Sequence, residues 1–406
     1  MARRVQGSKL VVVAVNPVQY HVHLYRALAA AGLDLEVFYA SKIGLVPYFD
    51  PMLNRELRWH SNLLEGYRHR FLERADAITG QGALEVNSAD LARALDEANP
   101  DVVLVYGYAN LDCWRAFFWA ITRRRRIFLV GDSELLRERS GWRVALKRLL
   151  LPLLFGRIDT FLTVGSRNED YYRAHGVPES RMQRAPFTIA EADLKQAAAR
   201  RDAIRPELLQ RHGIPADRIV VLYVGKLYPG KRPFDVLRAV GKAAAAGAAV
   251  HALFVGSGSD QTALEAEAQR LDLPASFAGF VNLDAIADYF AAADMLVLAS
   301  EIEAYGIVLL EGACAGLPLI ASNRIGGVGP SDAARPGENA LVYPAGDVDA
   351  LAAAVGRLCE DAELRAAYGR RSREIFDELD VQRAVDGICR ALSSVSRGRA
   401  NDRQSA

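Results

Sequence analysis

Short apolar runs alternate with helix-length amphipathic segments along most of the chain, and this alternation predicts an α/β protein. The apolar runs of the first half are continuous in Val, Ile and Leu, with few polar interruptions; they lie at 10–15, 102–106, 127–130 and 160–164. Strands of a parallel sheet are covered on both faces, so they read as continuous apolar runs. The segment 23–31 has helical spacing and ends at Gly32, as expected for a helix that follows the first strand.

The pattern stops in the polar stretch 188–215 and then starts again, which predicts a second unit of the same kind. In that unit the expected strands are 219–224, 251–255, 275–277, 295–299 and 318–321, and the expected helices lie near 233–247, 260–271, 284–292 and 306–315. The predicted fold class is therefore two doubly wound, Rossmann-like α/β domains, at 1–194 and 195–378. Because ligands bind at the carboxyl ends of parallel strands, we expect the two domains to face each other across a cleft.

Composition narrows the class of protein. A chain of 406 residues, 51% of them apolar, can build two large cores. The net charge of +1 gives no indication of nucleic-acid binding. Residues 1–190 nevertheless carry about six more basic than acidic side chains, and the rest of the chain is acidic.

The cysteines and the apolar runs bear on the compartment. The four cysteines are far apart and form no CxxC or Cys/His cluster, which favours a reduced intracellular protein without structural zinc. The first apolar run is too short for a signal peptide, and none approaches the roughly 20 residues of a membrane span. We expect a cytoplasmic protein.

The stretch SEIEAYGIVLLEGACAGLP (300–318) places one carboxylate, Glu303, just before a predicted helix and another, Glu311, inside it. Between them the first amides of the helix, at Tyr305, Gly306 and Ile307, have no partner within the helix, and the helix dipole favours an anion there. An anion flanked by two carboxylates suggests a pyrophosphate with hydroxylated groups at both ends, as in a nucleotide-sugar. The alternative is a helix-terminal charge at Glu303 and a solvated helix position at Glu311.

Three further loops follow predicted strands of the same sheet. In VLYVGKLYPGKR (221–232), Lys226 and Lys231 flank a turn, so both ammonium groups can converge on one anion. FVGSGSD (254–260) has two glycines that let backbone approach a ligand, and FAGFVN (277–282) offers backbone groups to a base edge. Each loop alone has a structural alternative, such as a pair of surface lysines, but four ligand-like loops along one sheet edge favour a binding site. The donor-binding candidates are Gly225, Gly256, Ser257, Gly258, Val281, Tyr305, Gly306, Ile307 and Glu311.

These motifs in this order, together with GG at 326–327 and GENALV at 337–342, resemble the retaining glycosyltransferases of family four, which have the GT-B fold. The resemblance implies that Lys226 and Lys231 contact the donor pyrophosphate, that Glu303 lies beside the transferred sugar and that Glu311 binds the ribose hydroxyls. Tyr305 stands where the family usually has Phe. The resemblance also implies that no metal and no cofactor is bound, and that 379–397 forms a helix returning to the N-terminal domain.

The N-terminal half departs from the family pattern. Many members have a glycine-rich loop after the first strand, whereas this chain has NPVQYHVH (16–23), with His21 and His23 as candidates for the cleft or as structural residues. Relatives often carry a histidine near the reacting centre after the strand 127–130. Here the residue is Asp132, a catalytic candidate whose alternative role is to cap the following helix.

The resemblance implies a retaining transfer of a sugar from a nucleoside diphosphate, with UDP favoured, to a hydroxyl of a glycan, glycolipid or other glycosylated acceptor. The acceptor would bind to the first domain and the donor to the second. Two alternatives remain open at this point: a nucleotide-sugar epimerase on the same fold, and a non-catalytic GT-B scaffold.

The segment SGWRVALKRLLLPLLFGR (140–157) combines basic residues and a tryptophan with a short apolar run. Such a segment can lie in the headgroup region of an anionic membrane, which would place the protein at the inner face of the membrane with a lipid-linked acceptor. The alternative is that 149–155 is a core helix of the first domain.

Overall fold

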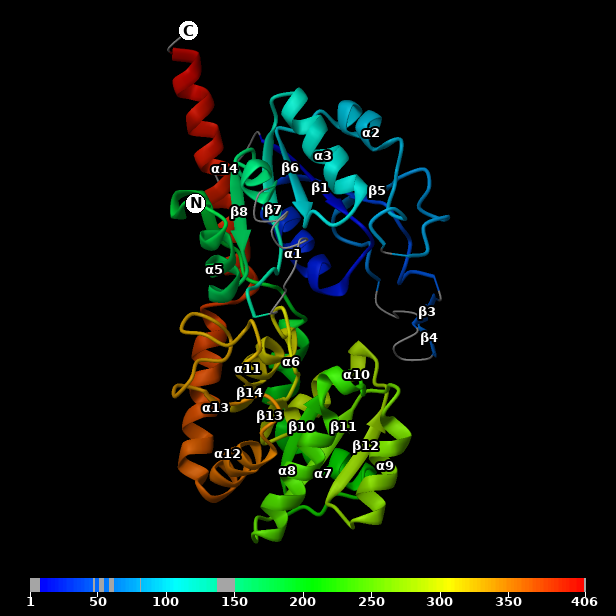
Figure 1. Ribbon diagram of the computed structural model, residues 1–406, viewed down its shortest axis with the longest axis vertical. Coiled ribbons are helices and arrows are strands. Elements are labelled where there is room, and N and C mark those ends of the chain that lie inside the picture. The colour runs from blue at the N-terminus through cyan, green and yellow to red at the C-terminus, as the bar shows by residue number, and fades with distance from the viewer. Residues whose placement is uncertain are drawn as a thin grey trace. The chain divides into compact units, whose positions relative to one another are not determined.

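The structure, a computed structural model, describes residues 8–46, 48–50, 55–57, 62–80, 82–136 and 150–404 (Figure 1). The chain divides into two compact units. One comprises Met1–Tyr48, Leu57–Thr188 and Asp380–Ala406, and the other Phe49–Glu56 and Ile189–Leu379. A short two-stranded sheet pairs β3 (Tyr48–Asp50) with β4 (Arg55–Leu57).

The first unit contains a seven-stranded sheet in the order β5-β2-β1-β6-β7-β8-β9, and its strand pairings are all parallel. The strand bounds are β1 Lys9–Ala14, β2 Asp34–Tyr39, β5 Arg68–Phe71, β6 Val102–Tyr106, β7 Arg126–Val130, β8 Thr160–Thr163 and β9 Met182–Arg184. The order runs outward in both directions from β1 and β6, which makes the sheet doubly wound.

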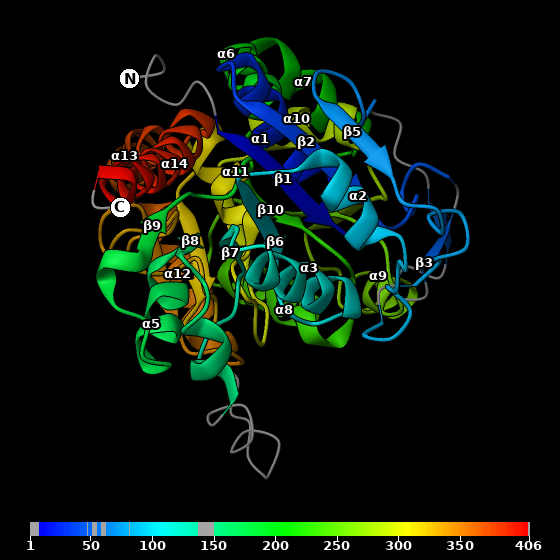
Figure 2. The same cartoon turned by 90° about the horizontal axis from the view of Figure 1, so that it is seen from above.

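Helices cover both faces of this sheet, and β1 shows why its sequence is continuously apolar. Val11 and Val13 belong to the core under α2 (Leu91–Ala98), α3 (Leu111–Thr122) and α5 (Ser166–Ala174). Leu10 and Val12 belong to the core on the other face, with α1 (Gln19–Ala30) and the last helix, α14 (Val381–Gln404). Successive side chains of a strand point to opposite faces, so every position must be apolar. Figure 2 shows α1 and α3 on opposite sides of the strands.

The second unit contains a six-stranded parallel sheet in the order β12-β11-β10-β13-β14-β15. Its strands are β10 Ile219–Val224, β11 Val250–Val255, β12 Ala275–Gly279, β13 Met295–Leu298, β14 Leu319–Ser322 and β15 Ala340–Tyr343. Its helices are α6 Glu191–Ala199, α7 Arg201–Arg211, α8 Pro233–Ala245, α9 Gln261–Arg270, α10 Leu283–Ala292, α11 Ile307–Ala315, α12 Val348–Glu360 and α13 Ala362–Asp377. Short 3₁₀ turns occupy Glu179–Arg181 in the first unit and Pro229–Lys231 in the second. The predicted fold class, two doubly wound parallel-sheet domains, is confirmed.

Two stretches differ from the simple sequence pattern. The polar stretch 188–215 forms α6 and α7. Each helix has a narrow buried face, which includes Leu194 in α6 and Leu208 in α7. Of the basic segment 140–157, residues 140–149 lie outside the described part. Residues 150–155 are helical, with Leu151, Leu154 and Phe155 in the core, and Leu150 and Leu153 exposed.

Among the described residues no helix is both long enough and apolar enough to cross a membrane.

Candidate functional site

The predicted site residues of the second unit follow the carboxyl ends of four neighbouring strands. Lys226 follows β10, Gly256 follows β11, Val281 follows β12 and Glu303 follows β13. These strands are parallel and adjacent in the order β12-β11-β10-β13, so their loops lie along one edge of the sheet. The structure therefore brings these residues to a common edge, where α/β sheets usually bind ligands.

Glu303 is held by both its side chain and its backbone. Its Oε1 accepts from Lys231 Nζ and from Ser300 Oγ, the latter at 2.8 Å. Its backbone N–H donates to Arg324 O (3.1 Å), and its carbonyl accepts from Gly326 N (3.0 Å). The carboxylate is thus fixed before any ligand arrives, and its second oxygen, Oε2, has no partner among the described residues.

A glycine pair makes this arrangement possible. A Cβ atom on Gly326 would overlap the carbonyl oxygen of Ala304, and one on Gly327 would lie 2.6 Å from the carbonyl oxygen of Tyr305. Gly327 N–H donates to the same oxygen at 2.6 Å. The backbone at 326–327 can therefore lie directly against the Glu303 loop only because both residues lack side chains.

Helix α11 begins at Ile307, one or two residues later than the sequence predicts. Gly306 precedes it with φ +87°, and a Cβ atom there would lie 2.8 Å from Leu298 Cδ2, so only glycine suits this position. The amides of Gly306, Ile307 and Val308 have no acceptor within the described part of the chain. Tyr305 is buried. The helix start thus offers N–H groups and the positive end of its dipole to an anion.

Glu311 is the fifth residue of α11, and it is only 8% exposed. Burial raises the pKa of its carboxyl to about 7. No hydrogen bond or ion pair is made to it by the described residues. The alternative of a solvated helix position is therefore excluded, and the carboxyl group is suited to hydroxyl donors that come from a ligand.

Gly256 and Gly258, which follow β11, are required for contact between two loops of the protein itself, and the sequence did not indicate this. A Cβ atom on Gly256 would overlap the carbonyl oxygen of Gly225, and one on Gly258 would overlap that of Leu227. Leu227 N–H donates to Ser257 O at 2.9 Å, so the loops after β10 and β11 lie backbone against backbone. The hydroxyl oxygen of Ser257 is buried without a hydrogen-bond partner among the described residues.

Sequence reasoning missed Tyr223, whose side chain contacts the lysine loop. Its hydroxyl donates to the carbonyl oxygen of Lys226 at 3.0 Å. Burial, and then the negative charge of Glu303, raises the pKa of Tyr223. In the sequence this tyrosine is one more apolar residue of a buried strand, so no signal identified it.

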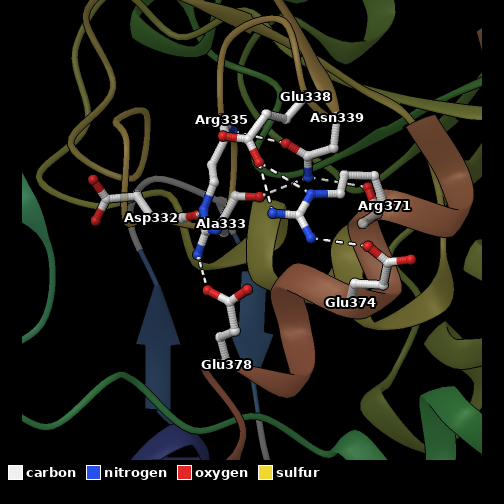
Figure 3. Close-up of polar contacts among 9 residues, drawn as sticks. Asp332, Ala333, Arg335, Glu338, Asn339, Arg371, Glu374 and Glu378 are labelled. Carbon is white, nitrogen blue, oxygen red and sulfur yellow. Dashed lines mark hydrogen bonds and ion pairs between the residues drawn. The ribbon is translucent and has the colours of Figure 1, made fainter. Parts of the chain in front are cut away.

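A polar network secures the segment that follows the glycine pair. Figure 3 shows Arg335 bonded to Glu378 (2.6 Å) and Arg371 bonded to Glu338 (2.8 Å). Asn339 Nδ2 donates to Ala333 O at 2.9 Å. The network attaches this segment to α13, and Ala334 N–H donates to Gly327 O at 3.1 Å, which links the segment to the glycine pair beside Glu303.

The candidate site residues of the first unit include Asp132, which is exposed, and His21, which packs against an aromatic ring. Asp132 is exposed after β7, and its charge adds to the effect of burial in raising the pKa of Tyr172. Residues 133–136, which directly follow Asp132, are not helical, so no helix begins there for Asp132 to cap. His21 stacks on Tyr106 with ring centroids 4.2 Å apart, and burial lowers its pKa to about 4. His21 is therefore neutral near pH 7 and has a structural contact.

Two family models match the chain. Residues 17–188 match a glycosyl transferase 4-like domain, and residues 204–375 match glycosyl transferases group 1. Together the two ranges include every predicted site residue.

Individual relatives agree. The chain is 33% identical over 190 residues to the D-inositol 3-phosphate glycosyltransferase of Acidothermus cellulolyticus. The aligned region covers 44% of this chain and 42% of that protein. The chain thus spans less than half the length of the curated relative it matches. The HepE protein of Anabaena, solved in complex with UDP, is 17% identical with a TM-score of 0.72, covering 95% of this chain and 100% of that one. A glycosyltransferase of Rickettsia africae has a TM-score of 0.73 at 11% identity, covering 96% and 99%. With both domains matched and the fold in common, the chain belongs to the family-four type of glycosyltransferases with the GT-B fold.

Proposed function

We propose that this protein transfers a glycosyl group from a nucleoside diphosphate sugar to a hydroxyl of a glycan, glycolipid or other glycosylated acceptor. One observation carries the proposal: along α11, open amides at the helix start lie between a fixed carboxylate, Glu303, and a buried carboxyl without a protein partner, Glu311. A diphosphate at the amides, with a sugar on one side and a ribose on the other, would use all three features.

The roles follow from charge and burial. The diphosphate receives hydrogen bonds from the amides of Gly306 and Ile307 and positive charge from Lys226 and Lys231. Glu311 accepts hydrogen bonds from the ribose hydroxyls, which compensates the burial of its carboxyl. The loops at Gly225, Gly256–Gly258 and Val281 complete the donor side.

Glu303 acts on the transferred sugar. Lys231 and Ser300 both occupy its Oε1, so Oε2 is left to face the anomeric centre as positive charge develops there. As the bond to the leaving oxygen breaks, the diphosphate gains negative charge, which the two lysines and the helix amides stabilise. The transfer retains the anomeric configuration, as in the family that the motifs resemble.

On the acceptor side we propose the domain at 1–194, where Asp132 orients or deprotonates the incoming hydroxyl. UDP is the favoured nucleotide, because solved structures with the same fold contain UDP or UDP-glucose. A lipid-linked acceptor and a contact of 140–157 with the inner face of the membrane are the further parts of this proposal.

The test is incubation of the protein with a panel of UDP-, GDP- and ADP-sugars, with and without an acceptor extract. The expected result is nucleoside diphosphate release that depends on acceptor, and NMR of the product should show the donor's anomeric configuration. Acceptor-independent conversion of one nucleotide-sugar into another would instead identify an epimerase. Binding of a nucleotide without turnover of any nucleotide-sugar would indicate a non-catalytic scaffold.

A further inference from the structure

A pocket of about 390 Å³ lies at the other end of α11, away from the open amides. Its floor includes Ala315 and Gly316, where α11 ends, and Asp294 and Pro318, which directly precede β13 and β14. It therefore lies at the amino ends of these strands, whereas the candidate site lies at their carboxyl ends. The nine residues of α11 separate the two places by about 12 Å along its axis.

Four arginines line this pocket. Arg365, Arg370 and Arg373 come from α13, together with the small residues Ala366 and Gly369 of the same helix. These positions recur every three or four residues, so they share one face of α13. The fourth, Arg201, comes from the start of α7. The result is a hollow with a small-residue floor and guanidinium groups around it.

Two of the arginines are occupied by protein groups. Arg201 donates to the carbonyl oxygen of Ala291 (2.6 Å) and pairs with Asp294 (2.6 Å). Arg365 donates to the carbonyl oxygen of Leu358 at 2.6 Å, at the end of α12. Arg201 and Arg365 thus donate hydrogen bonds to carbonyl groups in the last turns of α10 and α12, which have no partner within their helices.

Arg370 and Arg373 differ from the other two. Both are exposed, and within the described part of the chain neither makes a hydrogen bond or an ion pair. Their neighbour Arg371 shows the contrast: it turns away to Glu338 and Glu374, at 2.8 and 2.9 Å (Figure 3). Glu338 and Glu374 thus pair with Arg371, and neither of them lies in the pocket lining.

The helix ends nearby do not balance this charge. Three helices, α6, α10 and α11, end at the pocket with about half a negative charge each, and two, α7 and α13, begin there with about half a positive charge each. Asp294 is the only acidic residue in the described lining, and its oxygens already accept from Arg201 and, at 2.9 Å, from Arg205. Against these roughly one and a half negative charges stand the four lining arginines, which leaves an excess of about two and a half positive charges.

We propose that this pocket binds a small polyanion carrying phosphate or carboxylate groups, at a site separate from the donor site. Guanidinium forks bind phosphate and carboxylate oxygens in pairs, and the charge excess suits a dianion or trianion. The volume is in the range of small-molecule sites, so a compact metabolite fits it better than a polymer. The site is independent of the proposed transfer and stands if that function is wrong.

The test is isothermal titration of the full-length protein with inorganic pyrophosphate, and separately with citrate, at constant ionic strength. We expect at least one of these anions to bind, and to bind at least about tenfold more weakly to R370S/R373S, because charge-assisted hydrogen bonds are lost. The matched control is R211S, which removes an exposed arginine from the far end of α7. Because pyrophosphate can also occupy the proposed diphosphate site at Lys231, the titrations are repeated with K231A, in which the binding that depends on Arg370 and Arg373 should remain.

Three results would overturn the proposal. The first is that neither anion binds, and the second is that R211S weakens binding as much as R370S/R373S does. The third is that binding is lost in K231A but kept in R370S/R373S, which would assign the anion to the donor site. Circular dichroism checks that the double variant is folded, and R370S and R373S alone repeat the test with a smaller change.

Discussion

At the residue scale, Glu303 and Glu311 have the same chemical group in opposite surroundings, and we predict different kinetic effects. Glu303 is ion-paired to Lys231 and beside the proposed sugar, so Glu303→Gln should lower kcat by orders of magnitude while donor binding persists. Glu311 would bind ribose equally in the ground and transition states, so Glu311→Ala should chiefly weaken donor binding. Turnover assays with calorimetric binding of UDP separate the two effects. Equal losses confined to kcat in both variants would contradict the division.

The raised pKa of Glu311 predicts opposite pH trends for stability and for binding. The pKa of Glu311 is about 7 in the folded state and 4.5 for an exposed glutamate, so between these pH values the folded state holds a proton that the unfolded state has lost. Stability therefore falls as pH rises through this window, by a total of about 3 kcal/mol. Glu311→Gln should recover about that amount at pH 8 and nothing at pH 4. Denaturant unfolding at the two pH values measures it.

Donor affinity should change in the other direction, because the ionised carboxylate is the better acceptor for ribose hydroxyls. We expect UDP to bind the wild type more tightly as pH rises through 7, relative to Glu311→Gln. The comparison with this variant removes the titration of UDP itself. Parallel pH profiles for the two proteins would show that Glu311 does not contact the nucleotide.

The lysines should contribute to the rate through charge on the leaving diphosphate. Lys226→Ala or Lys231→Ala is expected to lower the rate by roughly 10²–10³, as other groups that stabilise transition-state charge do. Lys231→Ala also removes the ion pair of Glu303, so its loss should be the larger of the two. Rates measured with and without a chelator complete the test, since a clear magnesium requirement for the chemical step would count against the assignment.

At the element scale, the loop at 326–327 should be as important as the residues that touch the substrate. A Cβ atom on Gly326 would overlap the Ala304 carbonyl and displace the Glu303 loop, so Gly326→Ala should abolish most activity. Gly356, inside α12, has open space around it. Gly356→Ala should leave activity unchanged and stabilise the protein by about 0.5–1 kcal/mol. Comparable activity in the two variants would show that the backbone contact does not position Glu303.

The position of a strand in its sheet decides whether the sequence could predict it. Strands such as β6 and β10 lie inside a sheet and are apolar at nearly every position, so their extents follow from the sequence. The strands β5 (RHRF) and β9 (MQR) lie at sheet edges, where one side is unpaired and polar residues are tolerated, and no apolar run marks them.

The site divides in a similar way. Glu303 and the lysines were identifiable because parallel strand order places strand-end loops together. Ser300 and Tyr223 join the site through hydrogen bonds to residues three positions away, and Gly326 through its backbone hydrogen bond to Glu303, 23 positions away. Neither hydrophobic periodicity nor charge pattern encodes such contacts, and only the glycine pair left a trace in the sequence.

At the scale of the whole molecule, the uneven charge of the chain leads to a prediction about the membrane. About six excess positive charges lie in residues 1–190, and anionic lipids attract such a surface within about 10 Å at moderate salt. In the described end of the segment 140–157, Leu150 and Leu153 are exposed, the second at 69%. These leucines can enter the headgroup region, whereas Leu151 and Leu154 are committed to the core.

We therefore expect the protein to sediment with anionic liposomes at low salt and to be released at high salt. Leu150→Gln combined with Leu153→Gln should weaken this binding, because apolar contact with the acyl boundary is lost. Leu84→Gln is the matched control, since Leu84 is equally apolar and 75% exposed but distant in sequence. Equal binding by both variants would move the contact away from this segment. Absence of binding even at low salt would remove the physical support for a lipid-linked acceptor, and a soluble glycan would then be the better candidate.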